Sequence, residues 1–268
     1  MNILDCTLRD GGYRNYWHFS VDLIQNYLTA INNVGIKHVE MGLRLVEKND
    51  SYGICAYCPD EFLENLNIPD GLEIAVMIKA DEILAFGNPE KILNNLFSDS
   101  QNSPVGTIRV AVPYQKGLSC FKIIEFLKNK GYKTALNLTK TNPDSEKALS
   151  EIAAVIQNWD CLDVLYFADS FGVLNPADVR KFVLATKQVY EGSLGFHGHN
   201  NKGLAYKNAL ISIENDIDYI DSTVTGIGKG MGNLKTEEII KEFPDRYDAG
   251  CLSDLVKFIS MSSWGKIE

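Results

Sequence analysis

The chain has 268 residues, 45% hydrophobic and 23% charged, which is typical of globular proteins and excludes wholesale disorder. Its 26 basic against 35 acidic residues give a net charge of −9, which argues against a nucleic-acid or anionic-membrane partner. No apolar run approaches the roughly 20 residues of a membrane span, and the first residues do not resemble a signal peptide. The six scattered cysteines are therefore expected to be reduced thiols of a cytoplasmic protein.

Short apolar runs alternate with amphipathic stretches along the whole chain. Residues 21–34 show the helical spacing most clearly, and Gly35 is placed to end that helix. Strands are predicted at residues 3–8, 36–41, 72–78, 106–112, 133–138, 162–168, 194–199 and 219–224. Helices are predicted at residues 21–34, 59–66, 90–97, 120–128, 145–156, 176–189, 204–213, 235–242 and 253–261.

This alternation predicts an α/β protein. Eight strand–helix units in about 250 residues have the count and length of a (β/α)8 TIM barrel. An open, doubly wound sheet uses the same alternation, but the count of eight favours the barrel. No linker or change of composition marks a boundary, so residues 1–268 are predicted to form a single TIM-barrel catalytic domain.

Polar residues follow several of the predicted strands. In a barrel, the residues that carry chemistry lie at the C-terminal ends of the strands. The first strand runs into Arg9 and Asp10, and the sixth into Asp169 and Ser170. Glu40 and Lys79 end the second and third strands, where they could bind substrate or form a structural ion pair, and the structural reading is favoured.

The segment GFHGHNN places His197 and His199 two residues apart on a predicted strand, so both imidazoles face the same side. Two imidazoles and a carboxylate can hold a divalent metal with positions left open for substrate. Asp10 is the candidate carboxylate, on a segment where two glycines are expected to let the backbone turn sharply. The alternatives are two core histidines bonded to backbone and an Arg–Asp pair on a surface turn.

Three spaced motifs carry a family resemblance. TLRDGG near the N-terminus, HGHNN on the seventh strand and STVTGIGKGMGN after the eighth together resemble the DRE-TIM metallolyase superfamily, described as HMGL-like or as the pyruvate carboxyltransferase domain. The resemblance covers about residues 1–240 and keeps the expected strand order. The superfamily includes 4-hydroxy-2-oxovalerate aldolases, 3-hydroxy-3-methylglutaryl-CoA lyase, condensing synthases and biotin-dependent carboxyltransferases.

The resemblance implies a site and a cofactor. It implies that a divalent cation is bound by residues on three of the motifs, Asp10, His197, His199 and Asn233. Mg²⁺ or Mn²⁺ is the cofactor it implies, with Zn²⁺ or Co²⁺ as alternatives. Arg9 matches the arginine that stabilises the enolate oxygen, and Ser170 resembles a residue that binds the 2-oxo acid carboxylate. Gly228 and Gly230 are expected to let the backbone approach the substrate closely.

Departures from the family pattern favour the aldolase branch. The loop after the eighth strand lacks the reactive cysteine of the acyl-CoA lyases, and the sixth strand lacks the modified lysine of the carboxyltransferases. Standard aldolases have a histidine base shortly after the Arg–Asp pair, where this chain has Tyr13. Tyr13 is the first candidate for the catalytic acid/base group, and His18 is the second.

About 30 residues follow GMGN, too few for the C-terminal communication domain of the standard aldolases, so no channelling dehydrogenase is expected as a partner. A homodimer is the oligomeric state that the family likeness suggests. Cys55 and Cys58 form a C-x-x-C without a second ligand pair, and they are expected to pack a loop. The Gly-rich run at residues 226–232 lacks the surroundings of a dinucleotide-binding motif.

The sequence therefore predicts a metal-dependent (class II) aldolase that acts on a 4-hydroxy-2-oxo acid, making or breaking the bond next to pyruvate through a metal-stabilised enolate. Its partner would be a small-molecule substrate, with no nucleic acid and no membrane. Two alternatives stay open: an acyl-CoA-dependent Claisen-type lyase or synthase of the same superfamily, and a non-catalytic barrel that binds a metal or metabolite.

Overall fold

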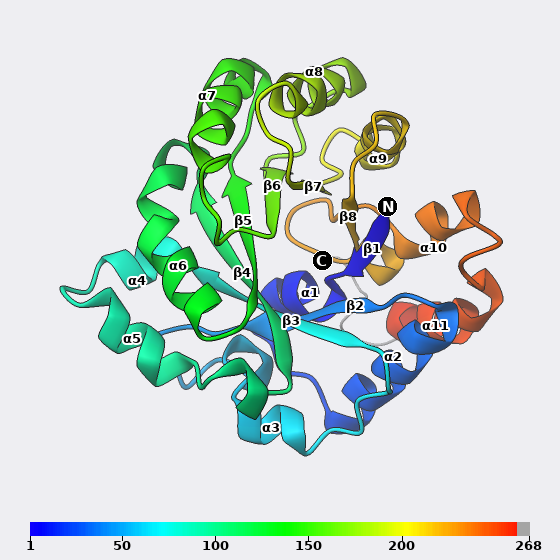
Figure 1. Cartoon of the computed structure of the whole chain (residues 1–268). Coiled ribbons are helices and arrows are strands. Elements are labelled where there is room, and N and C mark those ends of the chain that lie inside the picture. Colours follow the sequence, from blue (N-terminus) through cyan, green and yellow to red (C-terminus); the bar gives the residue numbers. More distant parts are fainter. Residues whose placement is uncertain (262–268) are drawn as a thin grey trace.

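The computed structural model describes residues 1–261, so the last seven residues of the predicted single domain lie outside the described part. Eight parallel strands close into a barrel in chain order, from β1 to β8, with β8 pairing back onto β1. Helices surround this barrel (Figure 1). The predicted (β/α)8 barrel is confirmed.

The strands are β1 (Asn2–Asp5), β2 (His38–Leu43), β3 (Glu73–Lys79), β4 (Val105–Pro113), β5 (Lys133–Thr139), β6 (Val164–Asp169), β7 (Ser193–Gly198) and β8 (Tyr219–Ser222). The helices are α1 (Thr7–Asn15), α2 (Val21–Val34), α3 (Asp60–Glu64), α4 (Ala80–Leu84), α5 (Pro89–Leu96), α6 (Phe121–Asn129), α7 (Glu146–Ile156), α8 (Pro176–Lys187), α9 (Ala205–Glu214), α10 (Thr236–Ile239) and α11 (Ser253–Met261). Among residues 1–261, no helix combines the length and apolar character that crossing a membrane requires.

Local sequence signals fix several of the helix ends. The side chain of Ser20 accepts a hydrogen bond from the Leu23 N–H at the start of α2, and Gly35 ends that helix with a φ of 97°. Asn175 caps α8 in a capping box with Asp178. Each cap satisfies backbone groups that have no partner inside the helix, so the helices begin and end where these residues stand.

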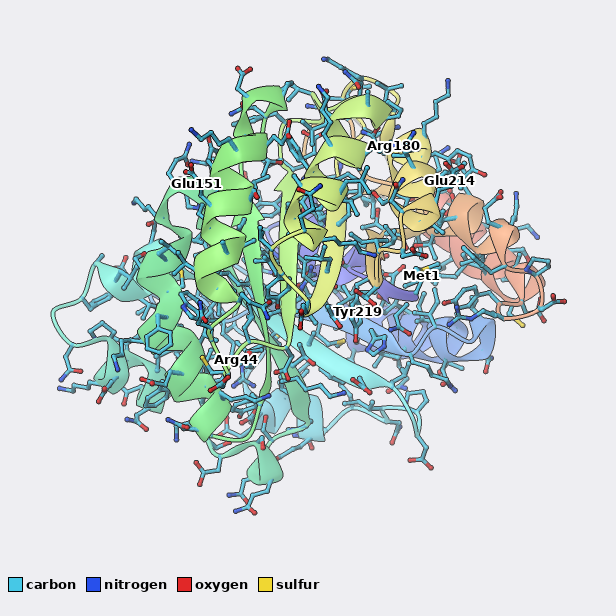
Figure 2. All side chains as sticks on the ribbon, turned by 45° about the horizontal axis from the view of Figure 1, so that its top comes forward. Met1, Arg44, Glu151, Arg180, Glu214 and Tyr219 are labelled. Carbon is cyan, nitrogen blue, oxygen red and sulfur yellow. The ribbon has the colours of Figure 1, made fainter. Side chains whose placement is uncertain are left out.

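The outer helices present charged side chains to solvent, as the labelled Glu151, Arg180 and Glu214 show in Figure 2. Their apolar faces pack on the outside of the barrel, where the buried core lies between helices and strands. Inside the barrel the picture differs, because several inward-facing side chains are charged and fully buried, among them Glu40, Arg109 and Asp221. Two of them, Glu40 and Asp221, contact residues of the candidate site.

The first strand is shorter than predicted. β1 ends at Asp5, and α1 begins at Thr7, so TLRDGG is helical and not part of a strand and turn. The buried Asp5 carboxylate explains this start, because it accepts a hydrogen bond from the Thr7 N–H at 2.9 Å. The same carboxylate also accepts hydrogen bonds from Tyr27 and Thr236, which fixes its position.

Candidate metal centre

Arg9 and Asp10 lie on the first turns of α1, at the end of β1, and both are buried. The sharp turn expected at Gly11 and Gly12 is wrong, since both glycines are helical. The structure gives another reason for Gly12. A Cβ there would stand 2.6 Å from Cγ of Trp17, whose ring folds back over the helix and donates from Nε1 to the Arg9 carbonyl at 2.9 Å. Gly12 therefore makes room for the ring that braces Arg9.

His197 at the end of β7 and His199 just after it both lie close to Asp10. Their Nε2 atoms lie 3.3 Å apart, and they are 3.6 and 3.9 Å from Oδ2 of Asp10. All three side chains are buried. Two ligands of one cation at 2.0–2.2 Å would themselves be separated by about 3.0–3.6 Å. The three groups are thus spaced nearly as the ligands of a single cation would be.

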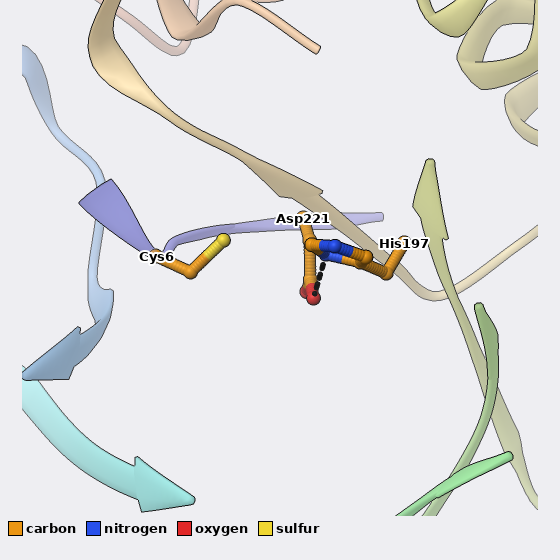
Figure 3. Close-up of side chains that lie close together, drawn as sticks. All are labelled: Cys6, His197 and Asp221. Atoms are coloured by element: carbon orange, nitrogen blue, oxygen red, sulfur yellow. Dashed lines mark hydrogen bonds and ion pairs between the residues drawn. The ribbon is translucent and has the colours of Figure 1, made fainter. Parts of the chain in front are cut away.

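Each imidazole is oriented by a second hydrogen bond. Nδ1 of His197 lies 3.0 Å from Oδ2 of Asp221, a contact that Figure 3 shows beside the Cys6 thiol. Nδ1 of His199 lies 3.3 Å from the carbonyl oxygen of Lys229. Both partners accept hydrogen bonds, so each Nδ1 carries a proton, and each Nε2 is left on the side of Asp10, where it can bind a cation. This is the tautomer that metal binding needs.

Asn233 completes the cluster from the loop after β8. Its Nδ2 donates to Oδ2 of Asp10 and, at 3.3 Å, to the Ile227 carbonyl. Its Oδ1 is buried and has no hydrogen-bond partner among the described residues. A buried acceptor without a donor is costly, and a cation is one way to satisfy it. The donor set of two imidazoles, one carboxylate and one amide oxygen therefore fits a divalent cation.

The electrostatics of the cluster also suit a cation. Burial raises the pKa of Asp10, but Arg9, the two histidines and the Asn233 hydrogen bond outweigh it and bring the pKa to about 2. Burial lowers the pKa of His199 to about 4 against the opposing effect of Asp10. At neutral pH the carboxylate is charged and His199 is neutral, which are the protonation states of metal ligands.

Arg9 lies between two carboxylates. Its Nη1 is 3.0 Å from Oδ1 of Asp10, and its Nε donates to Oε2 of Glu40 at 2.6 Å. Burial lowers the pKa of Arg9, but Glu40 and Asp10 together raise it well above its ordinary value. Glu40 is therefore a buried ion-pair partner, as the structural reading predicted. Lys79, by contrast, pairs with Glu82 at 2.9 Å and is partly exposed.

Tyr13 lies on α1 together with Arg9 and Asp10, whereas His18 lies beyond the end of that helix. Tyr13 follows Asp10 by three residues and Arg9 by four on α1, so it shares their helix face. Its ring packs edge-on against Trp17 with centroids 4.7 Å apart, and 39% of the side chain is exposed. Burial raises the pKa of its phenol, although nearby Arg9 opposes that effect. His18 is exposed, with Nε2 3.1 Å from the Ser51 carbonyl oxygen.

The predicted substrate-binding residues have structural partners of their own. The Ser170 hydroxyl accepts a hydrogen bond from the Lys140 N–H at 2.9 Å. The carbonyl oxygens of Gly228 and Gly230 accept hydrogen bonds from Arg14 at 2.8 and 3.0 Å. A Cβ on Gly228 would stand 3.1 Å from Oδ2 of Asp10, so this glycine lets the loop pack against the cluster.

A second group of potential ligands comprises Cys6, His197 and Asp221. Burial raises the pKa of the Cys6 thiol well above its ordinary value, so it is not a thiolate at neutral pH. Asp221 is already paired with Arg109, at 2.6 Å, and with His197. The three side chains are therefore a poor metal site, and Asp221 instead orients the His197 imidazole through its hydrogen bond with Nδ1. Cys55 and Cys58 are both buried, and the Cys58 thiol donates to the Cys55 carbonyl at 3.4 Å, which agrees with the loop-packing role predicted for them.

Sequence reasoning missed Asp221, Arg109 and Arg14. Asp221 occupies an inward position of a strand, and Arg109 stands in the middle of GTIRVAV, which read as an ordinary buried strand. Alternation along β4 places Thr107, Arg109 and Ala111 on one face of the strand. This pattern could have indicated that the charged side chain of Arg109 points into the barrel. Nothing in the sequence shows which charge it meets.

Comparison with known proteins gives a consistent assignment. A family model described as HMGL-like matches residues 116–258. A 4-hydroxy-2-oxovalerate aldolase from Thermomicrobium roseum is 29% identical over 239 residues, which cover 88% of this chain and 65% of that protein. A 4-hydroxy-2-oxovalerate aldolase from Rhodococcus opacus is 27% identical, over 91% of this chain and 68% of that protein. The chain thus spans about two thirds of the length of these relatives.

Solved structures match nearly the whole chain. The N-terminal domain of a proposed aldolase from Bacteroides vulgatus has a TM-score of 0.87 and 29% identity, covering 97% of this chain and 86% of that one. Hydroxymethylglutaryl-CoA lyase from Pseudomonas aeruginosa has a TM-score of 0.77 at 16% identity, covering 99% of this chain and 94% of that one. At that identity the likeness to the lyase shows a shared fold.

Proposed function

The chain belongs to the HMGL-like family, and on that premise we propose that it is a divalent-metal-dependent aldolase acting on a 4-hydroxy-2-oxo acid. The observation that supports this most directly is the convergence of Asp10, His197 and His199 on one point next to a buried arginine. The relatives named as 4-hydroxy-2-oxovalerate aldolases support the same activity.

In this proposal Asp10, His197, His199 and Asn233 hold the cation, and Mg²⁺ or Mn²⁺ is the cation that the family resemblance implies. The bound cation supplies a Lewis acid for the carbonyl of the 2-oxo acid. Arg9 lies next to Asp10 and meets the negative charge that develops on that carbonyl oxygen when the carbon–carbon bond breaks.

Tyr13 is the proposed acid/base group. Because the pKa of its phenol is raised, it is protonated at neutral pH. In the bond-forming direction it donates that proton to the alkoxide oxygen of the product. In the cleavage direction it takes the proton of the 4-hydroxyl while passing its own to solvent, which its exposed edge can reach. Ser170 stays a proposed carboxylate ligand, with Gly228 and Gly230 lining the same mouth.

The experiment that tests this proposal is proton exchange into pyruvate. The full chain is incubated in D₂O with diamagnetic Mg²⁺ and pyruvate, and loss of the methyl signal is followed by proton NMR. An aldolase of this type exchanges those protons, and Asp10→Asn abolishes the exchange. Glu151→Gln, an exposed change on α7, is the control and leaves it intact.

Two other outcomes would replace the proposal. Turnover that requires an acyl-CoA, without pyruvate exchange, would assign the chain to the Claisen-type lyases or synthases. Mn²⁺ binding without any exchange or acyl-CoA turnover would leave a metal-binding barrel that is not an aldolase.

A further inference from the structure

Buried ion pairs connect two of the candidate metal ligands through the inside of the barrel. Starting from Asp10, the first link is Arg9, whose Nη1 lies 3.0 Å from the carboxylate. The second is Glu40 on β2, which accepts from Arg9 Nε at 2.6 Å. The third is Arg109 on β4, whose Nη1 lies 3.0 Å from the same Glu40 oxygen. Each of these side chains is at most 7% exposed.

Arg109 closes the connection on the other side. Its Nη2 donates to Oδ2 of Asp221 on β8 at 2.6 Å, and that same oxygen lies 3.0 Å from Nδ1 of His197. The guanidinium also lies over the ring of Tyr166, 4.5 Å from its centroid. Asp221 and Glu40 stand on strands that are not neighbours in the barrel, so Arg109 spans them from β4. The connection therefore returns to His197, and Arg109 is its central member.

The chemistry of this position calls for an arginine. A planar guanidinium holds two carboxylates in fixed directions: Nη2 donates a hydrogen bond to Asp221, and Nη1 forms an ion pair with Glu40 at 3.0 Å without hydrogen-bond geometry. A lysine ammonium is a single point charge on a flexible stem. Glu40 and Asp221 are fully buried, and without Arg109 each loses a partner that offsets the cost of burying its charge. Both carboxylates would then move or rotate to find other donors. Arg9 and His197 depend on these carboxylates for their own positions.

We propose that Arg109 is a positioning residue for the metal centre, although it belongs to neither the metal ligands nor the substrate-contacting groups. It holds Glu40 and Asp221, and through them it fixes the direction of the Arg9 guanidinium and of the His197 imidazole. The inference rests on the proposed function only in that the site binds a divalent cation, and it does not depend on which reaction follows.

A simple charge effect predicts the opposite outcome, which makes the inference testable. Arg109 is a buried cation in the same barrel interior as the metal centre, so its charge alone would repel a second cation. If charge were its whole contribution, removing it would tighten metal binding, and replacing it with lysine would change little. If Arg109 positions the ligands, both substitutions weaken metal binding.

The test compares Arg109→Met and Arg109→Lys with Arg44→Met in the full chain. Arg44 is a closely matched control: it is 3% exposed, forms an ion pair with Asp60 and lies over the Phe97 ring at 4.9 Å, but it has no link to the metal centre in the described structure. Mn²⁺ dissociation constants are measured from the EPR signal of the free ion. Both Arg109 variants should bind Mn²⁺ about 10–100-fold more weakly than the unsubstituted protein. The dissociation constant of the Arg44→Met control should stay within about twofold of the unsubstituted value.

A second readout needs no metal. In the unsubstituted protein ¹⁵N NMR of the histidines should show Nδ1 of His197 fully protonated, and in the Arg109 variants only partly. Arg109→Met that binds Mn²⁺ as tightly as the unsubstituted protein, or Arg109→Lys with unchanged affinity and unchanged Nδ1 protonation, overturns the inference. If Arg109→Met does not fold, the Mn²⁺ affinity and the His197 signals of Arg109→Lys alone test the inference. Failure of pyruvate exchange with these effects intact would remove the proposed function and leave the role of Arg109 standing.

Discussion

Gly228→Ala offers a direct test of the metal centre, because it adds one methyl group and changes no charge. The new Cβ would overlap Nδ2 of Asn233, and it would stand 3.0 Å from Cγ of Asn233 and 3.1 Å from Oδ2 of Asp10. Gly228 does not have a positive φ, so alanine is not excluded by backbone strain. The perturbation is therefore steric and is aimed at two of the proposed ligands.

The size of the effect follows from these distances. Carbon atoms in contact prefer about 3.5–4.0 Å, so the Asn233 amide must move by about 1 Å or the loop must shift by as much. Overpacking of this kind costs about 1–3 kcal/mol of stability. Displacing a ligand by that distance should weaken Mn²⁺ binding by about 10–100-fold, which equals about 1.4–2.8 kcal/mol of binding free energy.

The assay is an Mn²⁺ titration of Gly228→Ala followed by EPR, with thermal unfolding to show that the variant is folded. Gly87→Ala is the matched control, since its added Cβ meets nothing within 4 Å among the described residues and Gly87 does not have a positive φ. The control should bind Mn²⁺ normally. A folded Gly228→Ala protein with unchanged Mn²⁺ affinity would refute the placement of the cation between Asp10 and Asn233.

Three further results are expected. Arg9→Ala should lower turnover by about 10²–10³-fold in protein that is shown to be folded, since losing the buried pairs with Glu40 and Asp10 also lowers stability, and near-normal pyruvate exchange would remove its assigned role. Tyr13→Phe should slow bond cleavage while leaving Mn²⁺ and pyruvate binding nearly intact, so an unchanged rate would exclude the phenol. The metal-free protein should lose stability as the pH falls from 6.5 to 4, because the unfolded chain protonates His199 while the fold resists it. His199 contributes about 3 kcal/mol of this loss, and that contribution should be missing from the urea unfolding of His199→Gln.

The sequence was sufficient to predict the barrel because the fold depends on a repeating pattern. Alternating apolar runs and amphipathic segments recur eight times, and the predicted C-terminal ends of the third to seventh strands lie within one residue of the observed ends. The same logic led to His197 and His199, because a two-residue spacing on a strand fixes the side that both imidazoles face. Pairing them with Asp10 needed only the rule that all strand ends meet at one mouth.

The start of α1 could not be predicted in this way. The segment from Ile3 to Leu8 was predicted to be one strand although it contains Asp5, and the two glycines after Asp10 suggested a turn. The helix is set instead by two short-range contacts: the Asp5 carboxylate accepts a hydrogen bond from the Thr7 N–H two residues on, and the Trp17 ring packs against Gly12. An Asp shortly before a helix is a local signal of its start, whereas the position of the Trp17 ring has none, because Trp17 follows the helix that it packs against.

Arg109 is the harder case, yet its neighbourhood explains how an arginine can occupy the middle of a barrel. Gly195 on β7 lies beside Tyr166 on β6, and a Cβ on Gly195 would overlap the Tyr166 ring. That ring in turn supports the Arg109 guanidinium. Ala135, the register partner of Arg109 on β5, is also small. A buried charge needs space as well as counter-charges. The small residues beside Arg109 and Tyr166, together with the Asp221 carboxylate on β8, therefore mark where the barrel interior is built around a cation rather than around aliphatic side chains.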